Sequence, residues 1–444
     1  AYAGIGIMVY FLMTSLGEMA TFMPVSGSFA EYASRFVDPA AGFALGWNYW
    51  LNWAITLAVD VSTTLPVLWE WNLSTTAIVM HFWLPNVPGW IFSLGFLALI
   101  FLINITSVKA FGETEYWLSM VKVLTVIVFL IVGVLTIVGV LGGGPAIGLR
   151  NYQIGDAPFH NGLPATLSVF VVAGFSFQGT ELIGITAGES ATPEKSIPKA
   201  IKEVFWRILL FYILAIAVIA AIIPYMSPNL LGASASDVAI SPFTLVFRRI
   251  GLAGAASLMN AVILTSVISS ANSGMYASTR MLWAMGSTGF APRIFSKTSD
   301  RGIPLPALLL TSFVGALTFL TSILGPHVYE LLVTASGLTG FIAWLGIAVS
   351  HYRFRRAFIA QGHHVQELVY HAKWFPFGPL LAIVMGVIVI LGQGFASVAN
   401  FSWERLLISY ASIPLFIGLY LYYKIKHKTH LIKLQDVDLS KHRE

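Results

Sequence analysis

Long apolar runs, separated by short polar or Pro- and Gly-containing stretches, repeat along the whole chain. A helix needs about 20 mostly apolar residues to cross the hydrocarbon core of a bilayer, so runs of about 18 or more are candidate spans. The pattern predicts eleven membrane-spanning helices, at residues 2–22, 41–70, 89–108, 116–141, 163–188, 205–226, 243–285, 305–324, 327–350, 375–394 and 404–425. The fold class expected from this pattern is therefore an all-α integral membrane protein.

Composition agrees with this class and excludes others. Of 444 residues, 57% are hydrophobic and only 10% are charged, far from the averages of soluble domains. The chain has no cysteine, so disulfides and thiolate metal sites are excluded. No P-loop, HExxH or GxSxG motif occurs. We therefore expect no enzyme, no nucleic-acid binding, no metal and no cofactor.

The positions of Lys and Arg predict the orientation. Twenty of the 25 basic residues fall on one set of alternate loops or in the C-terminal tail, and four fall on the other side. Basic loops face the cytoplasm, which places the C-terminus inside. The first apolar run then begins outside, and one further helix upstream would place the N-terminus inside as well.

The fifth run, 163–188, is interrupted between Gly174 and Glu181. Unpaired backbone groups cost several kcal/mol in hydrocarbon, so such a break is tolerated where it lines a cavity or a ligand. The alternative is a continuous helix that packs closely through small residues, but packing would not need Glu181, whose carboxylate costs roughly 2.5–3.5 kcal/mol at bilayer depth. The prediction is a helix broken around a binding site. Candidate ligand-binding residues are Gly174, Phe175, Ser176, Gln178 and Glu181.

Aromatic residues of the second run are further candidates. Tyr49 and Trp53 are four residues apart, and therefore share one face of a helix. Aromatic side chains in membrane helices more often contact lipid or core, but an aromatic face also suits an ammonium group, at about 0.5–2 kcal/mol.

Lys122 lies inside the fourth run and has two interpretations. It either extends its ammonium to the headgroups, or it is buried and releases a proton when the site changes shape. Glu189, at the cytoplasmic end of the broken helix, is expected in a salt bridge or gate. A second interruption is predicted at 334–340, and the basic tail after Lys424 is expected to be solvated or to lie on the membrane surface.

Several longer segments resemble one known group of proteins. They are YFLMTSLGEMATFMPVSGSFAEY at 10–32, FALGWNYWLNWAITLAVD at 43–60, FGETEYWLSMVKVLTVIVFLIVGV at 111–134, GFSFQGTELIGITAGES at 174–190, NSGMYASTRML at 272–282 and GFIAWLGIAVSHYRFRR at 340–356. With them the chain resembles the bacterial amino acid permeases of the amino acid–polyamine–organocation superfamily. GFSFQGTELIG and SHYRFRR favour the lysine-specific group within it.

The resemblance implies a LeuT-type core of five-plus-five inverted repeats followed by two C-terminal helices. Of twelve helices, eleven would be visible and the first would be missing. The implied domains are a transporter core at 1–350, a cytoplasmic loop with two additional helices at 351–425, and a cytoplasmic tail at 426–444. By position, Lys122 matches a lysine that replaces a sodium ion of sodium-coupled relatives, Glu181 matches an acidic position of the broken helix, and Tyr49, Trp53 and Phe175 match cavity or gate aromatics.

The function that this resemblance implies is import of L-lysine across the inner membrane by alternating access, driven by a proton gradient. The expected partners are an amino acid substrate and the lipid bilayer. Alternatives are a symporter for a neutral or aromatic amino acid, a cationic amino acid exchanger, and a lysine-binding sensor that signals through a regulatory membrane protein.

Overall fold

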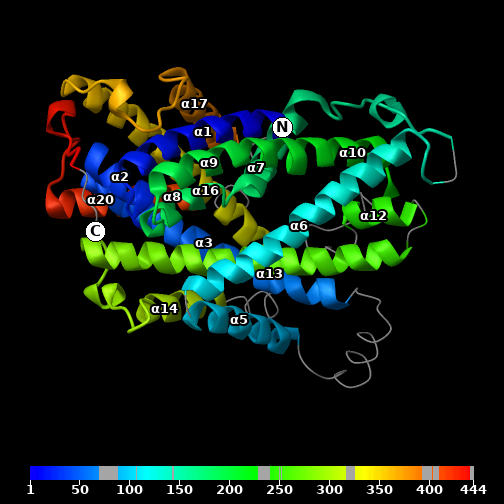
Figure 1. The fold of residues 1–444 in the computed structure, drawn as a ribbon, viewed down its shortest axis with the longest axis horizontal. Coiled ribbons are helices and arrows are strands. Elements are labelled where there is room, and N and C mark those ends of the chain that lie inside the picture. The colour runs from blue at the N-terminus through cyan, green and yellow to red at the C-terminus, as the bar shows by residue number, and fades with distance from the viewer. Residues whose placement is uncertain are drawn as a thin grey trace.

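The computed structural model describes residues 1–69, 89–106, 108–142, 145–228, 241–249, 251, 253–316, 326–392, 403 and 410–440. Every regular element within these ranges is helical (Figure 1), as the apolar pattern predicts. The α-helices are α1 Tyr2–Phe22, α2 Ser28–Phe36, α3 Pro39–Trp69, α5 Gly89–Thr106, α6 Val108–Ile137, α7 Gly162–Phe177, α8 Leu182–Thr186, α9 Pro193–Arg207, α10 Ala215–Ile222, α12 Pro242–Arg249, α13 Ala253–Thr288, α14 Leu305–Ala316, α16 Pro326–Ala360, α17 Phe377–Gly392 and α20 Ser412–His427. A π-helical segment, η4 Ile208–Leu214, joins α9 to α10, and single 3₁₀ turns are η2 Arg150–Gln153, η3 Ala187–Glu189, η6 Arg293–Ser296, η7 Val365–Glu367 and η8 Leu434–Asp436.

Three helical stretches in the described ranges are long and apolar enough to cross a membrane. They are Tyr2–Phe22, Gly112–Ile137 and Pro193–Ile222, with mean hydropathies of 1.4, 2.7 and 2.5. The count of eleven spans stays a prediction, because parts of the runs at 305–324, 375–394 and 404–425 lie outside the described residues.

Several elements differ from the sequence prediction, among them the following. The run at 243–285 is divided, since the chain turns at Gly251 with a φ of +82° between α12 and α13. The predicted interruption at 334–340 is wrong, because α16 passes through it as one helix of 35 residues. The run at 205–226 starts earlier, at Pro193, where proline at the first helical position suits the helix start.

The molecule is elongated, and α2, α8 and α20 gather at one end of it, opposite the end that carries α12 (Figure 1). Helix α2 packs against α3 and α16 through Phe29, Tyr32 and Phe36, each fully buried. Burial of each such side chain stabilises the fold by about 1.5–3 kcal/mol. This end of the bundle is therefore tightly packed.

Asp38 ties the start of α3 to α20. Its Oδ1 accepts a hydrogen bond from the Ala40 N–H at 2.9 Å, which is the usual role of aspartate before a helix. Its Oδ2 accepts one from Lys424 Nζ at 2.9 Å. On α2, Arg35 Nε pairs with Glu31 Oε1 at 2.6 Å, so the charged side chains at this end are paired within α2 and between α3 and α20.

The backbone of the tail is hydrogen-bonded to the rest of the protein. Residues 428–440, which we name the C-terminal strap, fold back over α2 and α16. The Ile432 N–H donates to the Val37 carbonyl at 2.9 Å, and Arg353 donates to the Ile432 carbonyl. Gln361 Nε2 donates to the carbonyls of Leu434 and Val437, at 3.1 and 2.8 Å. Most side chains of the strap are exposed, and only Val437 of this segment is buried. The strap is therefore solvated on its outer side while its backbone is hydrogen-bonded to the protein.

At the opposite end, the segment before α7 is held by Asp156. Its carboxylate accepts the Asn161 N–H at 2.9 Å and hydrogen-bonds with His160 and Tyr225, both at 2.7 Å. These hydrogen bonds, first that of the Asn161 backbone, favour the ionised carboxylate and lower the pKa of Asp156 below its ordinary value.

Candidate functional site

The helix break lies where the fifth apolar run predicts it, but it is shorter. Helix α7 stays helical to Phe177, and the chain leaves the helix at Gln178, whose ψ is 146°. Gly179 follows with a φ of +96°, which side chains rarely allow, and α8 starts after Glu181. Gly174 is not part of the break. It lies within α7. A Cβ at this position would be 2.0 Å from the Phe341 ring, so the absence of a side chain allows α16 to approach α7.

Glu181 is the centre of the break. Its side chain is buried, at 1% exposed. Oε1 accepts the Tyr49 hydroxyl and Oε2 accepts the Trp344 indole N–H, both at 3.1 Å. The Gly179 N–H lies 3.2 and 3.1 Å from the two oxygens. Three donors, from α3, α16 and the break itself, therefore surround a carboxylate that has no cation beside it in the described contacts.

Gln178 connects the break to α3 and α16. Its Nε2 donates to the carbonyls of Ser336 and Gly337, at 3.3 and 3.2 Å, and its Oε1 accepts from Asn52 Nδ2 at 3.3 Å. A Cβ on Gly340 would lie 2.0 Å from Gln178 Nε2. The small residues at 334–340 thus serve close approach of the glutamine and not a second break.

A buried polar network extends from this point between α3 and α16. The Oδ1 atom of Asn52 accepts the hydroxyls of Ser336 and Thr339, at 2.9 and 2.7 Å. The hydroxyls of Thr56 and Ser336 are 2.8 Å apart. All four side chains are at most 6% exposed. Such satisfied networks hold side chains in one arrangement, so α3 and α16 fix the position of Gln178.

Of the two aromatic candidates, Tyr49 contacts Glu181 and Trp53 covers the turn. The Trp53 ring lies against two glycines, so that a Cβ on Gly179 would be 3.4 Å from it and a Cβ on Gly274 would be 3.0 Å from it. The tyrosine and tryptophan rings meet edge to face, with centroids 6.1 Å apart. The structure therefore brings Tyr49, Trp53, Gln178 and Glu181 together.

Phe175 and Ser176 lie on the helical side of the break. The Phe175 carbonyl accepts the Gln178 N–H at 3.1 Å. Ser176 contacts α1 and η4, because its hydroxyl lies 3.1 Å from the Tyr2 hydroxyl and its carbonyl accepts the Tyr212 hydroxyl at 2.8 Å. In this structure Ser176 is therefore part of the packing of α1 against η4.

Lys122 belongs to a separate cluster. Its Nζ donates to the Ser269 hydroxyl at 2.8 Å, so the side chain points toward α13. The Ser269 hydroxyl donates to Glu115 Oε2 at 2.6 Å, and Asn272 Nδ2 donates to Glu115 Oε1 at 2.9 Å. Asn104 of α5 donates to Asn272 Oδ1 at 2.8 Å. Polar residues of three helices thus meet around one lysine and one carboxylate.

Glu189 pairs with α13, as expected for a salt bridge at the end of the broken helix. Its Oε1 lies 2.9 Å from Arg280 Nε, and its Oε2 accepts the Tyr276 hydroxyl. The carboxylate therefore connects the end of the α7–α8 unit to α13.

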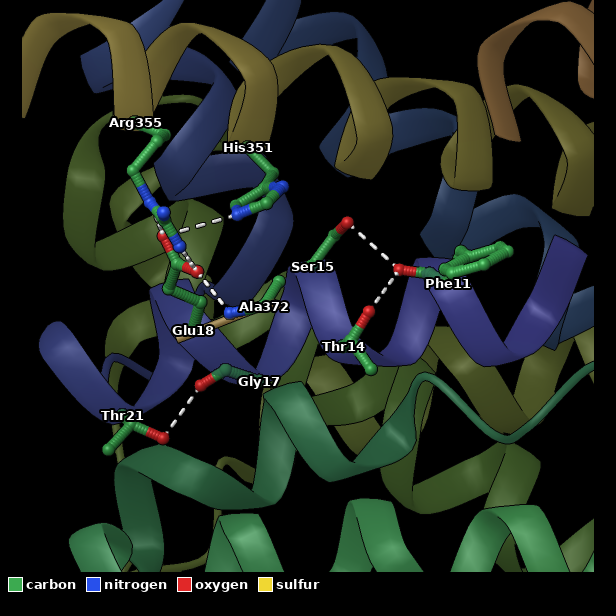
Figure 2. Close-up of polar contacts among 9 residues, drawn as sticks. All are labelled: Phe11, Thr14, Ser15, Gly17, Glu18, Thr21, His351, Arg355 and Ala372. Atoms are coloured by element: carbon green, nitrogen blue, oxygen red, sulfur yellow. Dashed lines mark hydrogen bonds and ion pairs between the residues drawn. The ribbon is translucent and has the colours of Figure 1, made fainter. Parts of the chain in front are cut away.

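A further charged cluster, which no sequence pattern predicted, lies between α1 and α16 (Figure 2). Glu18 and Arg355 are buried, at 0% and 4% exposed. Arg355 donates through Nε to Glu18 Oε1 at 2.6 Å and through a second nitrogen to Oε2. The Ala372 N–H also donates to Oε2 at 2.6 Å, and His351 Nε2 lies 3.2 Å from Oε1. This cluster joins α1, α16 and the segment before α17.

No group of three or more His, Asp or Glu side chains in the described ranges is arranged to hold a metal ion. The site is instead a buried polar centre at a break between two half-helices, within a helical membrane protein. A model of one family, amino acid permease, matches residues 1–435. The chain therefore belongs to the amino acid permease family and is a multi-pass membrane protein, as the sequence resemblance implies.

Relatives with assigned names support this assignment. The chain is 59% identical over 450 residues to the lysine-specific permease LysP of Lactococcus lactis, covering 100% of this chain and 86% of the relative. It is 55% identical to the histidine permease HisP of the same species, covering 99% of this chain and 90% of the relative. It is 52% identical to LysP of Escherichia coli, covering 98% and 88%.

Proposed function

We propose that the protein imports L-lysine across the inner membrane by alternating access, in symport with protons. The observation that carries the proposal is Glu181, a buried carboxylate at the helix break with no cation beside it in the described contacts. Two of the three relatives above are named lysine-specific permeases.

Substrate recognition follows from the chemistry of the break. The backbone ends of α7 and α8 suit the α-amino and α-carboxylate groups of an amino acid. The side-chain ammonium of lysine then replaces the Tyr49 hydroxyl or the Trp344 N–H at the Glu181 carboxylate, which accepts hydrogen bonds at about four lone-pair sites. The rings of Tyr49 and Trp53 face the ammonium. Substrate binding therefore loosens contacts between the break and α3 or α16.

Transport requires that the loosened site open toward the cytoplasm. We assign the Glu189 pair with Arg280 and Tyr276 as the contact that separates on opening, because it joins the α7–α8 unit to α13. Lys122 carries the coupled proton. The charge distribution supports a cytoplasmic C-terminus, and the proton gradient supplies the driving force.

The helices also suggest how the transporter is built. We infer that the first of two inverted repeats contains α1, α3, α5 and α6. The second repeat comprises α7–α8, α9–α10, α13, α14 and α16. Helices α17 and α20 then follow this core as two additional helices in the segment 351–425, before the tail at 426–444.

Histidine is the second candidate substrate, because the histidine permease HisP is almost as similar to this chain as LysP. The test is uptake by purified protein in proteoliposomes, with an imposed pH gradient and radiolabelled L-lysine or L-histidine. We expect gradient-driven lysine uptake that excess unlabelled lysine abolishes and histidine does not. Uptake of histidine, or of a neutral or aromatic amino acid in preference to lysine, would refute the substrate assignment.

Two further outcomes separate the remaining alternatives. Lysine exchange that needs no gradient would show a cationic amino acid exchanger. Saturable lysine binding without flux would show a sensor.

A further inference from the structure

The cluster around Lys122 contains a second titratable group to which no role has been assigned. Glu115 lies seven residues before Lys122 on α6, hence on the same face of the helix. The Ser269 hydroxyl of α13 bridges the two, accepting from Lys122 Nζ at 2.8 Å and donating to Glu115 Oε2 at 2.6 Å. An ammonium, a hydroxyl and a carboxylate are thus joined in one continuous hydrogen-bonded chain.

We propose that Glu115 receives the transported proton from Lys122 through the Ser269 hydroxyl and releases it toward the cytoplasm. In this step the serine proton moves to Glu115 Oε2, and one ammonium proton of Lys122 moves to the serine oxygen. The ammonium and carboxylate become a neutral amine and a carboxylic acid, and the serine hydroxyl is restored. Glu115 then gives its proton to water. This inference rests on the proposed proton coupling and names the group that follows Lys122.

The direction of transfer follows from the position of Glu115. At 1.5 Å rise per residue, seven residues correspond to about 10 Å along α6. Glu115 is nearer than Lys122 to Val108, where α6 begins. Lys109 is at that end of the helix, which the distribution of basic residues places on the cytoplasmic side. The relay therefore moves the proton inward.

Neighbouring groups suit this role. Asn272 donates to the second oxygen of Glu115 at 2.9 Å, and Asn104 holds the Asn272 amide oxygen at 2.8 Å. These amides keep Oε2 directed at Ser269.

A purely structural role, in which Glu115 only holds α6 to α13, makes a different prediction. Glu115→Gln keeps the size of the side chain and one acceptor oxygen, which can take the hydrogen bond from Ser269 or the one from Asn272 but not both, and it cannot carry a proton. Exchange of substrate across the membrane returns the carrier with its proton still bound, whereas net uptake requires proton release. The two activities therefore separate a proton acceptor from a packing residue.

The experiment uses the full chain in proteoliposomes and compares uptake driven by a pH gradient with counterflow at equal pH, using the amino acid that the wild type transports. For Glu115→Gln we expect gradient-driven uptake to fall at least about tenfold, as for loss of a positioned proton acceptor, while counterflow stays within about twofold. Glu113→Gln, an exposed carboxylate on the same helix, is the matched control and should resemble wild type in both assays.

Substitutions of Ser269 give a second test should Glu115→Gln fail to fold. Ser269→Ala removes the bridging hydroxyl and should reduce gradient-driven uptake more than counterflow. Ser269→Thr keeps the hydroxyl and should retain gradient-driven uptake. Equal activity of Glu115→Gln and wild type, or an equal loss of both activities, overturns the relay. If Lys122→Ala retains gradient-driven uptake, the proposed coupling fails together with the relay. If the Glu115 and Ser269 variants retain gradient-driven uptake while Lys122→Ala loses it, the coupling through Lys122 stands and the relay alone is wrong.

Discussion

The buried pair of Glu18 and Arg355 allows a quantitative prediction. Arg355→Met removes both guanidinium hydrogen bonds to Glu18 and leaves a side chain of similar length. The carboxylate remains at 0% exposure, with the Ala372 N–H and His351 as its partners. Removing one member of a buried ion pair costs about 3–5 kcal/mol, because the other charge stays buried without compensation. We expect the free energy of unfolding to fall by that amount.

Removing both charges should cost less than removing one. In Glu18→Leu/Arg355→Met, no charge is left buried, and the main loss is the acceptor of the Ala372 N–H, about 1–3 kcal/mol. The double-mutant cycle should therefore give a coupling energy of at least about 3 kcal/mol. Arg356→Met is the control, since Arg356 is exposed and its guanidinium lies over the Tyr352 ring at 5.6 Å, a contact worth about 0.5–1 kcal/mol.

The assay is reversible denaturation of the detergent-solubilised protein, followed by tryptophan fluorescence, for wild type, both single variants, the double variant and the control. A loss below about 1 kcal/mol for Arg355→Met would mean that water reaches the pair and screens it. A double variant no more stable than the single variants would equally refute the reasoning.

Three further predictions concern the site and the segment before α7. Gly340→Ala should reduce substrate binding at least about tenfold, since a Cβ 2.0 Å from Gln178 Nε2 must displace that side chain; binding isotherms equal to wild type would contradict this. Trp344→Phe removes one donor to Glu181 and should lower the free energy of unfolding of the ligand-free protein by about 1.5–3 kcal/mol. It should also enlarge the rise in melting temperature that lysine causes, because the lysine ammonium no longer competes with the indole N–H for the carboxylate. An unchanged rise would argue against displacement of the indole by the substrate. Because the folded-state pKa of Asp156 is lowered, its stabilising effect is present above the ordinary aspartate pKa of about 4 and is lost as pH falls below it. The difference in melting temperature between wild type and Asp156→Asn should narrow as the pH falls below about 4. A constant difference from pH 7 to pH 3 would refute the stabilising role of the ionised Asp156 carboxylate.

The hydrophobic pattern predicted the helical membrane class and the location of the break, because both follow from local sequence. It did not predict what each glycine does. Gly174 and Gly179 look equally able to interrupt a helix, but only Gly179 adopts a positive φ, whereas Gly174 makes room for Phe341. A glycine needed for close packing and one needed for a turn cannot be distinguished without the neighbouring helix.

Contacts between residues far apart in the sequence could not be predicted either. Trp344 donates to Glu181 across 163 residues, and Arg355 reaches Glu18 across 337 residues, so helical periodicity contains no sign of either contact. Glu115 is different. Its spacing of seven residues from Lys122 places both on one helix face, and that signal could have pointed to the pair from sequence alone.

The C-terminal strap offers a protease site that reports on movement at its end of the bundle. Lys433 is exposed, yet the residues on either side of it are fastened, Ile432 to Val37 and Arg353, and Leu434 to Gln361. Trypsin can cut only where a stretch of backbone is free to enter its cleft, so cleavage after Lys433 requires that this segment first detach. The rate of that single cut, followed with and without lysine, would register whether movements of α16 during turnover are transmitted to the strap.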